Sequence, residues 1–172
     1  MKVVLETPRL CLRELAEGDF PLLCRSLQDA EVMVAYEHPF TDEEVRAWLQ
    51  NQLRRYREEG CGLWGAVRRE DGAFLGQCGI TMQPYRGGRV FEVGYIFEKA
   101  HWHRGYATEA AAACMRHAFD VLGAESVYSF IRDNNIPSQR VAERNGMAVC
   151  DTVVKHYYGM DMPHLVYRAE RQ

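Results

Sequence analysis

Several patterns that would assign a protein class at once are missing from this chain. Its six cysteines include no Cys-x-x-Cys pair and stand mostly among apolar residues, at positions 11, 24, 61, 78, 114 and 150. They are typical of reduced, buried thiols in a cytoplasmic protein rather than of a disulfide framework. No repeat, low-complexity tract or linker divides the 172 residues, so we expect one domain over residues 1–172.

Signals for a membrane, a nucleic acid or a metal ion are missing too. The start of the chain lacks the apolar stretch of a signal peptide, and no run approaches the ~18 apolar residues of a membrane span. The 21 Lys and Arg against 24 Asp and Glu give a net charge of −3, which indicates no basic face for nucleic acid. The run Arg54–Arg57 is followed at once by two glutamates, which favours a solvated helix face. His101 and His103 have no third ligand at a suitable spacing, so we expect no metal site.

What the sequence does contain is a turn between a strand and a helix that is suited to an anion. Val90 to Phe97 is an apolar strand-like run, and from Ala107 onward apolar residues recur at helical spacing. At such a helix start the first N–H groups have no intrahelical partner, and the helix dipole adds positive charge. Gly105 lets the backbone approach an anion closely, and Arg104 adds a full charge. The turn therefore fits a diphosphate, although by itself it also fits an ordinary strand-to-helix connection.

A second strand and a short helix follow this first helix. Ser126 to Ile131 is strand-like; Asn135 can cap a helix whose first turn holds Pro137, and Gly146 fits the left-handed position that ends it. Adjacent parallel strands that each feed a helix leave a crevice at their carboxyl ends. Asn134 and Ser138 are expected at the edge of that crevice.

These segments resemble the GCN5-related N-acetyltransferase superfamily, in particular the ribosomal-protein N-terminal acetyltransferases and their relatives. The resemblance spans nearly the whole chain, including residues 6–13, 76–80 and 92–97, and is most specific at residues 102–110 and 134–146. It implies that acetyl-CoA is the co-substrate and that an amine attacks the thioester directly in a ternary complex. The loop formed by Trp102, His103, Arg104, Gly105, Tyr106 and Ala107 would hold the pyrophosphate. Tyr95, Ile96 and Phe97 would pair with the pantetheine arm, and Asn134 and Ser138 would line the thiol end.

Two catalytic residues are expected. An amine with a pKa near ~10 must lose a proton before it attacks, and Glu92, on the strand that enters the crevice, is the candidate base; the alternative is a solvated strand carboxylate without a role. Many superfamily members carry, at the position of Ala142, a Tyr that protonates the leaving thiolate. Ser138 is therefore the candidate proton donor here; the alternative is a residue at the helix start that only caps the backbone. The N–H groups of Tyr95 and Ile96 are candidates to stabilise an oxyanion if a bulge at Gly94 frees them. Glu109, in the first helical turn, favours a structural role that complements the helix dipole.

The first part of the chain is expected to form the acceptor side. Asp19 can cap a helix through Leu27, and the pattern from Thr41 to Glu44 is a capping box that opens a second helix. Between them lies a loop in which Tyr36, Glu37 and His38 are candidate acceptor-binding residues. A second loop, from His156 to Pro163, is expected to fold over the acceptor, between strands over residues 147–155 and 164–169.

The remaining turns complete the expected fold. Residues 63–69 and 74–82 should form a hairpin about Asp71-Gly72, and residues 84–88 a further turn. The predicted fold is α/β: a mixed, mostly antiparallel sheet with one parallel strand pair and helices on both faces.

The predicted function is acetyl transfer to a primary amine of a protein N-terminus, a polyamine or a small molecule, by a monomer or a homodimer. The alternative is an inactive, regulatory CoA-binding module, since fold by itself does not fix function.

Overall fold

The computed structural model describes all residues from Met1 to Gln172. One eight-stranded sheet carries four α-helices and three short 3₁₀ turns. In chain order the elements are β1 (Val3–Glu6), β2 (Leu10–Arg13), η1 (Glu17–Asp19), α1 (Phe20–Leu27), η2 (Val34–Tyr36), α2 (Asp42–Glu58), β3 (Leu63–Arg68), β4 (Phe74–Tyr85), β5 (Gly88–Phe97), η3 (Lys99–His101), α3 (Tyr106–Asp120), β6 (Ser126–Arg132), α4 (Ile136–Arg144), β7 (Ala148–Tyr157) and β8 (Met160–Glu170).

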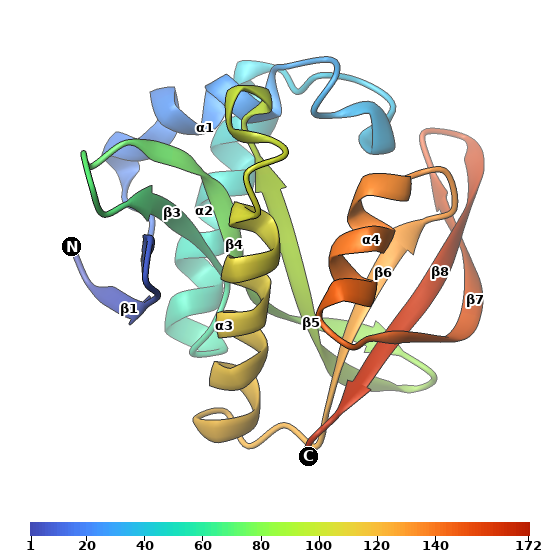
Figure 1. Ribbon diagram of the computed structural model, residues 1–172. Coiled ribbons are helices and arrows are strands. Elements are labelled where there is room, and N and C mark those ends of the chain that lie inside the picture. The colour runs from blue at the N-terminus through green and yellow to red at the C-terminus, as the bar shows by residue number, and fades with distance from the viewer.

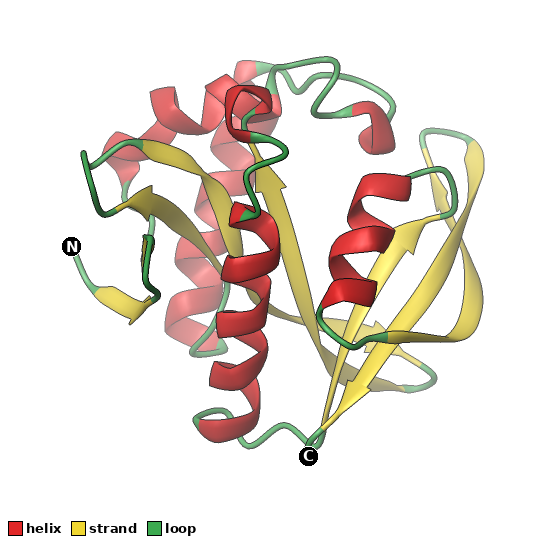
Figure 2. Ribbon diagram, in the orientation of Figure 1, coloured by secondary structure: helices red, strands yellow, loops and turns green.

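The sheet confirms the predicted fold class. Its strand order is β1-β2-β3-β4-β5-β6-β8-β7, and every neighbouring pair is antiparallel except β5 and β6. Helices α3 and α4 lie on one face of the sheet, and α1 and α2 lie behind it (Figures 1 and 2). No helix combines the length and the apolar character needed to cross a bilayer.

The parallel pair is short, and this feature shapes the site. β5 and β6 are in register at two positions alone, Phe91 with Val127 and Glu92 with Tyr128. Beyond these residues the two strands diverge toward their carboxyl ends (Figure 1). The carboxyl half of β5 therefore has a paired edge toward β4 and an open edge toward β6.

Small side chains let α3 pack closely on the sheet. Ala110, Ala111, Cys114 and Ala118 are buried at the expected helical spacing in the larger of two core clusters. The smaller cluster lies under α1 and α2 and includes Leu23, Val45 and Leu49. The packing of α3 fixes where its N-terminus meets the end of β5.

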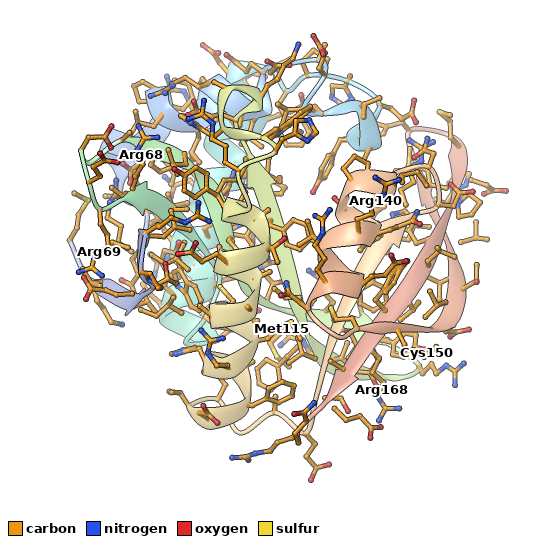
Figure 3. All side chains as sticks on the ribbon, in the orientation of Figure 1. Arg68, Arg69, Met115, Arg140, Cys150 and Arg168 are labelled. Atoms are coloured by element: carbon orange, nitrogen blue, oxygen red, sulfur yellow. The ribbon has the colours of Figure 1, made fainter.

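The cysteines are all free thiols, but they are not uniformly buried. Cys61, Cys78 and Cys114 lie in the interior, with the Sγ atoms of Cys78 and Cys114 3.6 Å apart. Cys11 and Cys24 are half-buried, and Cys150 is exposed on β7 (Figure 3). The expectation of buried thiols is wrong for Cys150, which lies on the last strand in the sheet order, where one face of the ladder meets solvent.

Two predicted loops are instead tight hairpins. β4 continues to Tyr85, so the turn after it is Arg86-Gly87 rather than residues 84–88, and β7 meets β8 through Tyr158-Gly159 rather than through a loop over residues 156–163. Both residues of each turn have positive φ, the conformation whose twist suits a two-residue hairpin. Asn-Gly or Asp-Gly is the usual sequence signal for such a turn. Arg86-Gly87 and Tyr158-Gly159 contain only its glycine, so the sequence did not predict these turns.

Pro84 is accommodated inside β4 because of its place in the ladder. The Glu98 N–H donates to the Leu75 carbonyl, which fixes the alternation of the β4–β5 hydrogen bonds. By that alternation the Pro84–Arg89 pair is a non-hydrogen-bonded pair. The missing N–H of proline thus faces away from β5 and costs no ladder bond.

The two expected helix caps have different outcomes. The Thr41 hydroxyl accepts from the Glu44 N–H, and the Glu44 carboxylate accepts from the Thr41 N–H, as a capping box requires. Asp19 precedes α1 but does not cap it with its side chain. Its carboxylate instead accepts two bonds from the Arg13 guanidinium, at 2.7 and 2.8 Å, and one from the Ala16 N–H, because this buried cation is the stronger partner.

Candidate active site

The turn between β5 and α3 presents a row of free main-chain donors. None of the N–H groups of residues 103–108 has a hydrogen-bond acceptor within the protein; the first satisfied amide of the helix is that of Glu109, which donates to the Gly105 carbonyl. His103 and Gly105 have positive φ and Arg104 between them does not, an alternation that turns successive N–H groups toward one concave surface. The concave row, at the positive end of α3, suits a diphosphate.

Side chains brace this turn from both sides. The Trp102 indole N–H donates to the Phe97 carbonyl at 2.9 Å and ties the start of the turn to the end of β5. The Arg9 guanidinium donates to the Arg104 carbonyl and to the Glu109 carboxylate, and it lies over the Tyr106 ring. The backbone conformation of the turn is therefore set before any anion binds.

Glu109 has the structural role expected for it. Its carboxylate accepts from the Thr7 hydroxyl, the Arg9 N–H and the Arg9 guanidinium. Burial raises the pKa of this carboxyl, but these hydrogen bonds outweigh burial and leave the pKa below its ordinary value. Glu109 thus joins the N-terminal strands to α3.

The open edge of β5 exposes alternate peptide groups. The Val93 carbonyl accepts from the Ser129 hydroxyl of β6, whereas the Glu98 N–H donates to β4, so odd-numbered residues of this segment face the gap and even-numbered residues face β4. Tyr95 accordingly directs its N–H and carbonyl into the gap; Phe97 directs its N–H there, while its carbonyl accepts from the Trp102 indole N–H. Ile96 directs its N–H to β4 and its side chain is buried, so its expected part in an oxyanion site is wrong.

The expected bulge at Gly94 is absent as well. The β4–β5 register runs without a shift from Gly76–Phe97 to Tyr85–Gly88. Divergence of β5 from β6, rather than a bulge, is what frees the Tyr95 N–H. Gly94 suggested a bulge, but the divergence of the strands leaves the Tyr95 N–H free without one.

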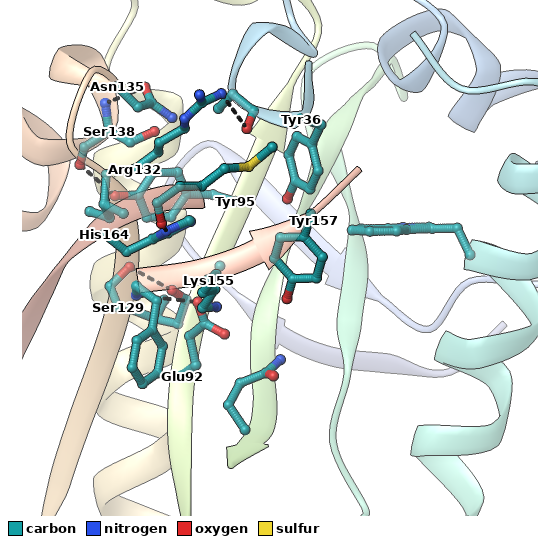
Figure 4. Close-up of a pocket in the computed structure, with 18 of the residues that line it drawn as sticks. Tyr36, Glu92, Tyr95, Ser129, Arg132, Asn135, Ser138, Lys155, Tyr157 and His164 are labelled. Atoms are coloured by element: carbon teal, nitrogen blue, oxygen red, sulfur yellow. Dashed lines mark hydrogen bonds between the residues drawn. The ribbon is translucent and has the colours of Figure 1, made fainter. Parts of the chain in front are cut away.

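A cavity of about 440 Å³ fills the space where the strands part. Its walls come from β5, β6, α4, α2, the η2 turn and the β7–β8 hairpin, and Figure 4 shows Glu92, Tyr95 and Ser138 around it. The sequence-predicted residues that line it are Tyr36, Glu92, Tyr95 and Ser138. The cavity adjoins the open edge of β5.

Glu92 lies at the bottom of the divergence. Its carboxylate accepts from the Phe130 N–H of β6 at 3.3 Å and so occupies the ladder position at which the strands separate. Burial raises the pKa of Glu92, and the charge of Lys155, the Phe130 N–H and the charge of Arg55 oppose that rise without cancelling it. A half-buried carboxylate with a raised pKa, directed into a cavity, differs from the solvated strand residue that was the alternative.

The start of α4 forms the neighbouring wall. Asn135 caps the helix by accepting from the Ser138 N–H, and the Ser138 carbonyl accepts from the Tyr95 hydroxyl at 2.7 Å. The Ser138 hydroxyl makes no hydrogen bond within the protein and lines the cavity. Asn134 is exposed and is not among the lining residues, whereas Asn135 is, because capping turns Asn135 inward.

The expected proton-donor position of the superfamily is closed. Ala142 is buried in the larger core cluster, so no side chain there reaches the cavity. Ser138 and Tyr95 carry the hydroxyl groups on this side of the cavity.

Of the three loop residues predicted to bind the acceptor, only Tyr36 lines the cavity. Glu37 forms an ion pair with Arg132 at the end of β6. His38 contacts the Glu44 carboxylate at 3.0 Å, and its ring lies edge-on to Tyr158 of the β7–β8 turn, with centroids 4.7 Å apart. Glu37 and His38 therefore hold the η2 loop against β6 and the hairpin and frame the cavity from outside.

Sequence reasoning missed several lining residues. Arg55 was placed on a solvated helix face, yet it lines the cavity together with Trp48, Asn51 and Gln52 of α2. Their spacing of three and four residues marks one face of a helix, a signal that was present in the sequence. Lys155 and Tyr157 come from β7, and their position depends on the hairpin that the sequence did not reveal.

No group of three or more His, Cys, Asp or Glu side chains lies close enough to hold a metal ion. His101 instead lies 3.8 Å from the Glu98 carboxylate, and burial lowers the pKa of His101. His103 is exposed in the turn before α3.

Comparison with known proteins agrees with this geometry. Residues 9–148 match the family model described as an acetyltransferase (GNAT) domain. Protein YkkB of Bacillus subtilis (strain 168) is 36% identical over 155 residues, which is 90% of this chain and 90% of YkkB.

Solved structures share the fold. The acetyltransferase from Agrobacterium tumefaciens str. C58 is 30% identical, with a TM-score of 0.82 over 97% of this chain and 94% of that one. RimL, the ribosomal L7/L12 alpha-N-protein acetyltransferase solved in complex with coenzyme A, has a TM-score of 0.78 over 98% of each chain at 15% identity, which is a likeness of fold. The loop, the divergent strands and these matches together show that the chain belongs to the GNAT family and is an acetyltransferase.

Proposed function

We propose that this acetyltransferase moves the acetyl group of acetyl-CoA directly to a primary amine within a ternary complex. One observation carries the proposal: β5 leads from a half-buried carboxylate, through an open strand edge, to a row of unpaired amides. A reacting amine, an extended amide-containing arm and a diphosphate group require these three features in this order.

The donor is assigned to the open edge and the turn. The N–H groups of residues 103–108, with the Arg104 side chain, would hold the diphosphate. The peptide N–H and carbonyl of Tyr95 and the N–H of Phe97 would pair with the arm. Asn135 and Ser138 would border the thiol end. The Tyr95 N–H faces the gap, where it is available to a carbonyl oxygen that gains negative charge.

Glu92 is assigned as the base. A protonated amine has no free electron pair, so a group near it must accept its proton before attack. The raised pKa of Glu92 brings this carboxylate closer to the working pH and increases its basicity. The leaving thiolate resembles a thiol of pKa ~8.5, for which a hydroxyl such as that of Ser138 is a sufficient donor.

The proposal includes a cellular setting. Free thiols, among them the exposed Cys150, suit a reducing compartment, so we place the protein in the cytoplasm, acting as one domain. Either a monomer or a homodimer is compatible with a site built entirely from one chain.

Initial-rate kinetics test the proposal. The protein is incubated with acetyl-CoA and a panel of primary amines, free thiol is followed with time, and the acetylated amine is identified by mass spectrometry. We expect acceptor-dependent thiol release and intersecting double-reciprocal plots. Parallel plots would instead indicate an acyl-enzyme, and tight CoA binding without turnover on any amine would indicate the regulatory module.

A further inference from the structure

Two cations face the cavity without a counter-ion of their own. Arg55 forms no ion pair or hydrogen bond, and its Nε atom is buried without a partner. Lys155 forms no ion pair either; its Nζ lies 4.8 Å above the Phe130 ring, and Figure 4 shows it beside Glu92. Buried donors are normally satisfied, so an unpaired guanidinium in a cavity wall indicates an anionic group that is bound during function.

The neighbouring acids form their ion pairs with other arginines. Glu59, one helical turn beyond Arg55, accepts from Arg89 through Oε1 at 2.8 Å; its Oε2 is buried without a hydrogen-bond partner, and Glu59 does not line the cavity. Glu37 is taken by Arg132, the other arginine of the cavity. Glu92 is the one carboxylate among the lining residues. Two cations therefore share a single acid.

His164 does not add to the positive charge at neutral pH. Burial lowers its pKa, and its Nδ1 lies 2.7 Å from the Met162 carbonyl. With Glu92 ionised, Arg55 and Lys155 leave one net positive charge on the cavity wall. A polyamine would add further positive charge to this wall, whereas an acceptor with one carboxylate would balance it.

We propose, building on the proposed function, that the acceptor is an amine that carries a carboxylate, which Arg55 and Lys155 bind while Glu92 receives the ammonium proton. After Glu92 takes one proton from the ammonium group, the amine attacks the thioester, so that an N–acetyl bond forms and the C–S bond breaks. The second proton lost by the nitrogen goes to the departing thiolate, which leaves as the free thiol of CoA. The carboxylate stays bound and is not consumed.

The rest of the cavity indicates the body of this acceptor. Five aromatic side chains from the η2 region, α2 and the β7–β8 hairpin line the cavity: Tyr36, Phe40, Trp48, Tyr157 and Tyr158. Tyr36 and Trp48 lie edge to face, with centroids 6.2 Å apart. Such a wall favours an apolar or aromatic body, and a cavity of about 440 Å³ suits an amino acid or the first residues of a peptide.

Acceptor pairs that differ in one charge test the proposal. Phenylalanine is compared with phenylalaninamide and spermidine by thiol release, and we expect kcat/KM for phenylalanine to exceed that for the amide by roughly tenfold or more, since charged hydrogen bonds are lost with the carboxylate. A peptide with an N-terminal Glu and an amidated end, against its Gln counterpart, distinguishes a side-chain carboxylate from that of a free amino acid. Equal rates within both pairs, or preference for spermidine, would overturn the proposal.

Substitutions of Arg55 in α2 and Lys155 in β7 test whether these two side chains cause the preference for a carboxylate. We expect Arg55→Met to reduce the ratio between carboxylate and amide acceptors by roughly tenfold, with the CoA affinity unchanged. Lys155→Met should act in the same direction and does not depend on the folding of α2. Arg54→Met is the control, because Arg54 pairs with Glu58 and donates to Asn51 but does not itself line the cavity; this change should leave the ratio intact. A lowered CoA affinity in Arg55→Met would assign Arg55 to the donor and overturn the proposal.

Product binding separates this inference from the transfer reaction. Calorimetry with N-acetylphenylalanine and its amide, on CoA-loaded protein, needs no turnover. Tighter binding of the acid by roughly tenfold supports the carboxylate site, and equal affinities contradict it, whether or not transfer is observed.

Discussion

The Glu92 carboxylate has two roles: it is the proposed base, and it replaces a backbone acceptor in the hydrogen-bond ladder between β5 and β6. Its carboxylate accepts the Phe130 N–H, which the separating strand β5 no longer accepts through its backbone. Burial of the carboxylate among its neighbours raises its pKa. The end of the parallel pair therefore directs this carboxylate into the cavity, and its burial there increases its basicity.

Replacement of Glu92 by Gln tests this assignment. We expect kcat to fall by roughly 10²- to 10⁴-fold while the CoA affinity is retained, because the amide keeps the shape and loses the base. The base works deprotonated, so wild-type activity should rise with pH through the raised pKa of Glu92, and Glu92→Gln should lack this acidic limb. Glu125→Gln, an exposed change, is the control for kcat and for the pH profile. A wild-type profile in Glu92→Gln would remove this residue from the mechanism.

Gly105 is the residue on which the anion turn depends. Its φ of 77° lies in the left-handed region, and a Cβ added there would approach the Arg9 guanidinium at 3.4 Å. A β-branched side chain is strained in this conformation and shifts the neighbouring N–H groups.

Gly105→Val should consequently weaken CoA binding by roughly tenfold or more in calorimetry, since several hydrogen bonds to charged oxygens depend on one backbone geometry. Gly123→Val is a matched control: Gly123 has a φ of 73°, open space around it and a position beyond the far end of α3. It should lower stability and leave the CoA dissociation constant unchanged. Equal affinities in wild type and Gly105→Val would contradict the turn assignment.

At the scale of elements, a buried ion pair connects the first strands to the acceptor side. Arg13 of β2 and Asp19 of η1 are 11% and 7% exposed, and their contacts hold the start of α1 against the sheet. Burial raises the pKa of Asp19, but the Arg13 hydrogen bonds and the Ala16 N–H bring the pKa below its ordinary value. The ionised carboxylate is therefore part of the folded state.

Asp19→Ala should lower the free energy of unfolding by about 3 kcal/mol at pH 7, because it leaves the Arg13 charge buried and unpaired. The folded pKa lies below the unfolded one, so the contribution of Asp19 is complete above the unfolded value of ~3.9 and is lost as pH falls through the folded value. Urea unfolding should thus show that wild type and Asp19→Ala differ less in their free energy of unfolding at pH 3 than at pH 7. Lys2→Met, which breaks an exposed pair with Glu14, should change stability by less than ~1 kcal/mol. A similar small change in Asp19→Ala would show that the pair is dispensable.

Elements with strong local signals were predictable from the sequence. α3 followed from its small apolar residues, and α4 from Asn135, Pro137 and the left-handed Gly146. Positions set by long-range packing were not predictable. The spacing in α2 places Arg55 on one helix face with Trp48 and Gln52, but where that face lies depends on how α2 docks. The length of the β5–β6 pair likewise depends on sheet twist, which no local pattern encodes. Glu92 was identified because its strand was clear, yet its burial became visible only in the fold.

At the scale of the whole molecule, the site is a seam between two halves of one sheet. Strands β1 to β5 lie on one side and β6 to β8 on the other, and they join through the short parallel pair at Phe91 and Glu92. Across the upper part of the seam, Glu37 contacts Arg132 and His38 contacts Tyr158. The donor and the acceptor would enter a gap whose width the backbone ladder does not fix.

The unsatisfied amides of residues 103–108 have one more consequence. Protons that no carbonyl retains exchange quickly with deuterated solvent, so mass spectrometry should find this peptide labelled within seconds in the free protein and markedly slower once CoA is added. Residues 112–118, inside α3, should remain protected in both cases and serve as the internal reference. Unaltered labelling of residues 103–108 at saturating CoA would place the ligand elsewhere. The protein therefore carries an isotopic signature of donor occupancy in its own main chain, one that can be read before any acceptor is known.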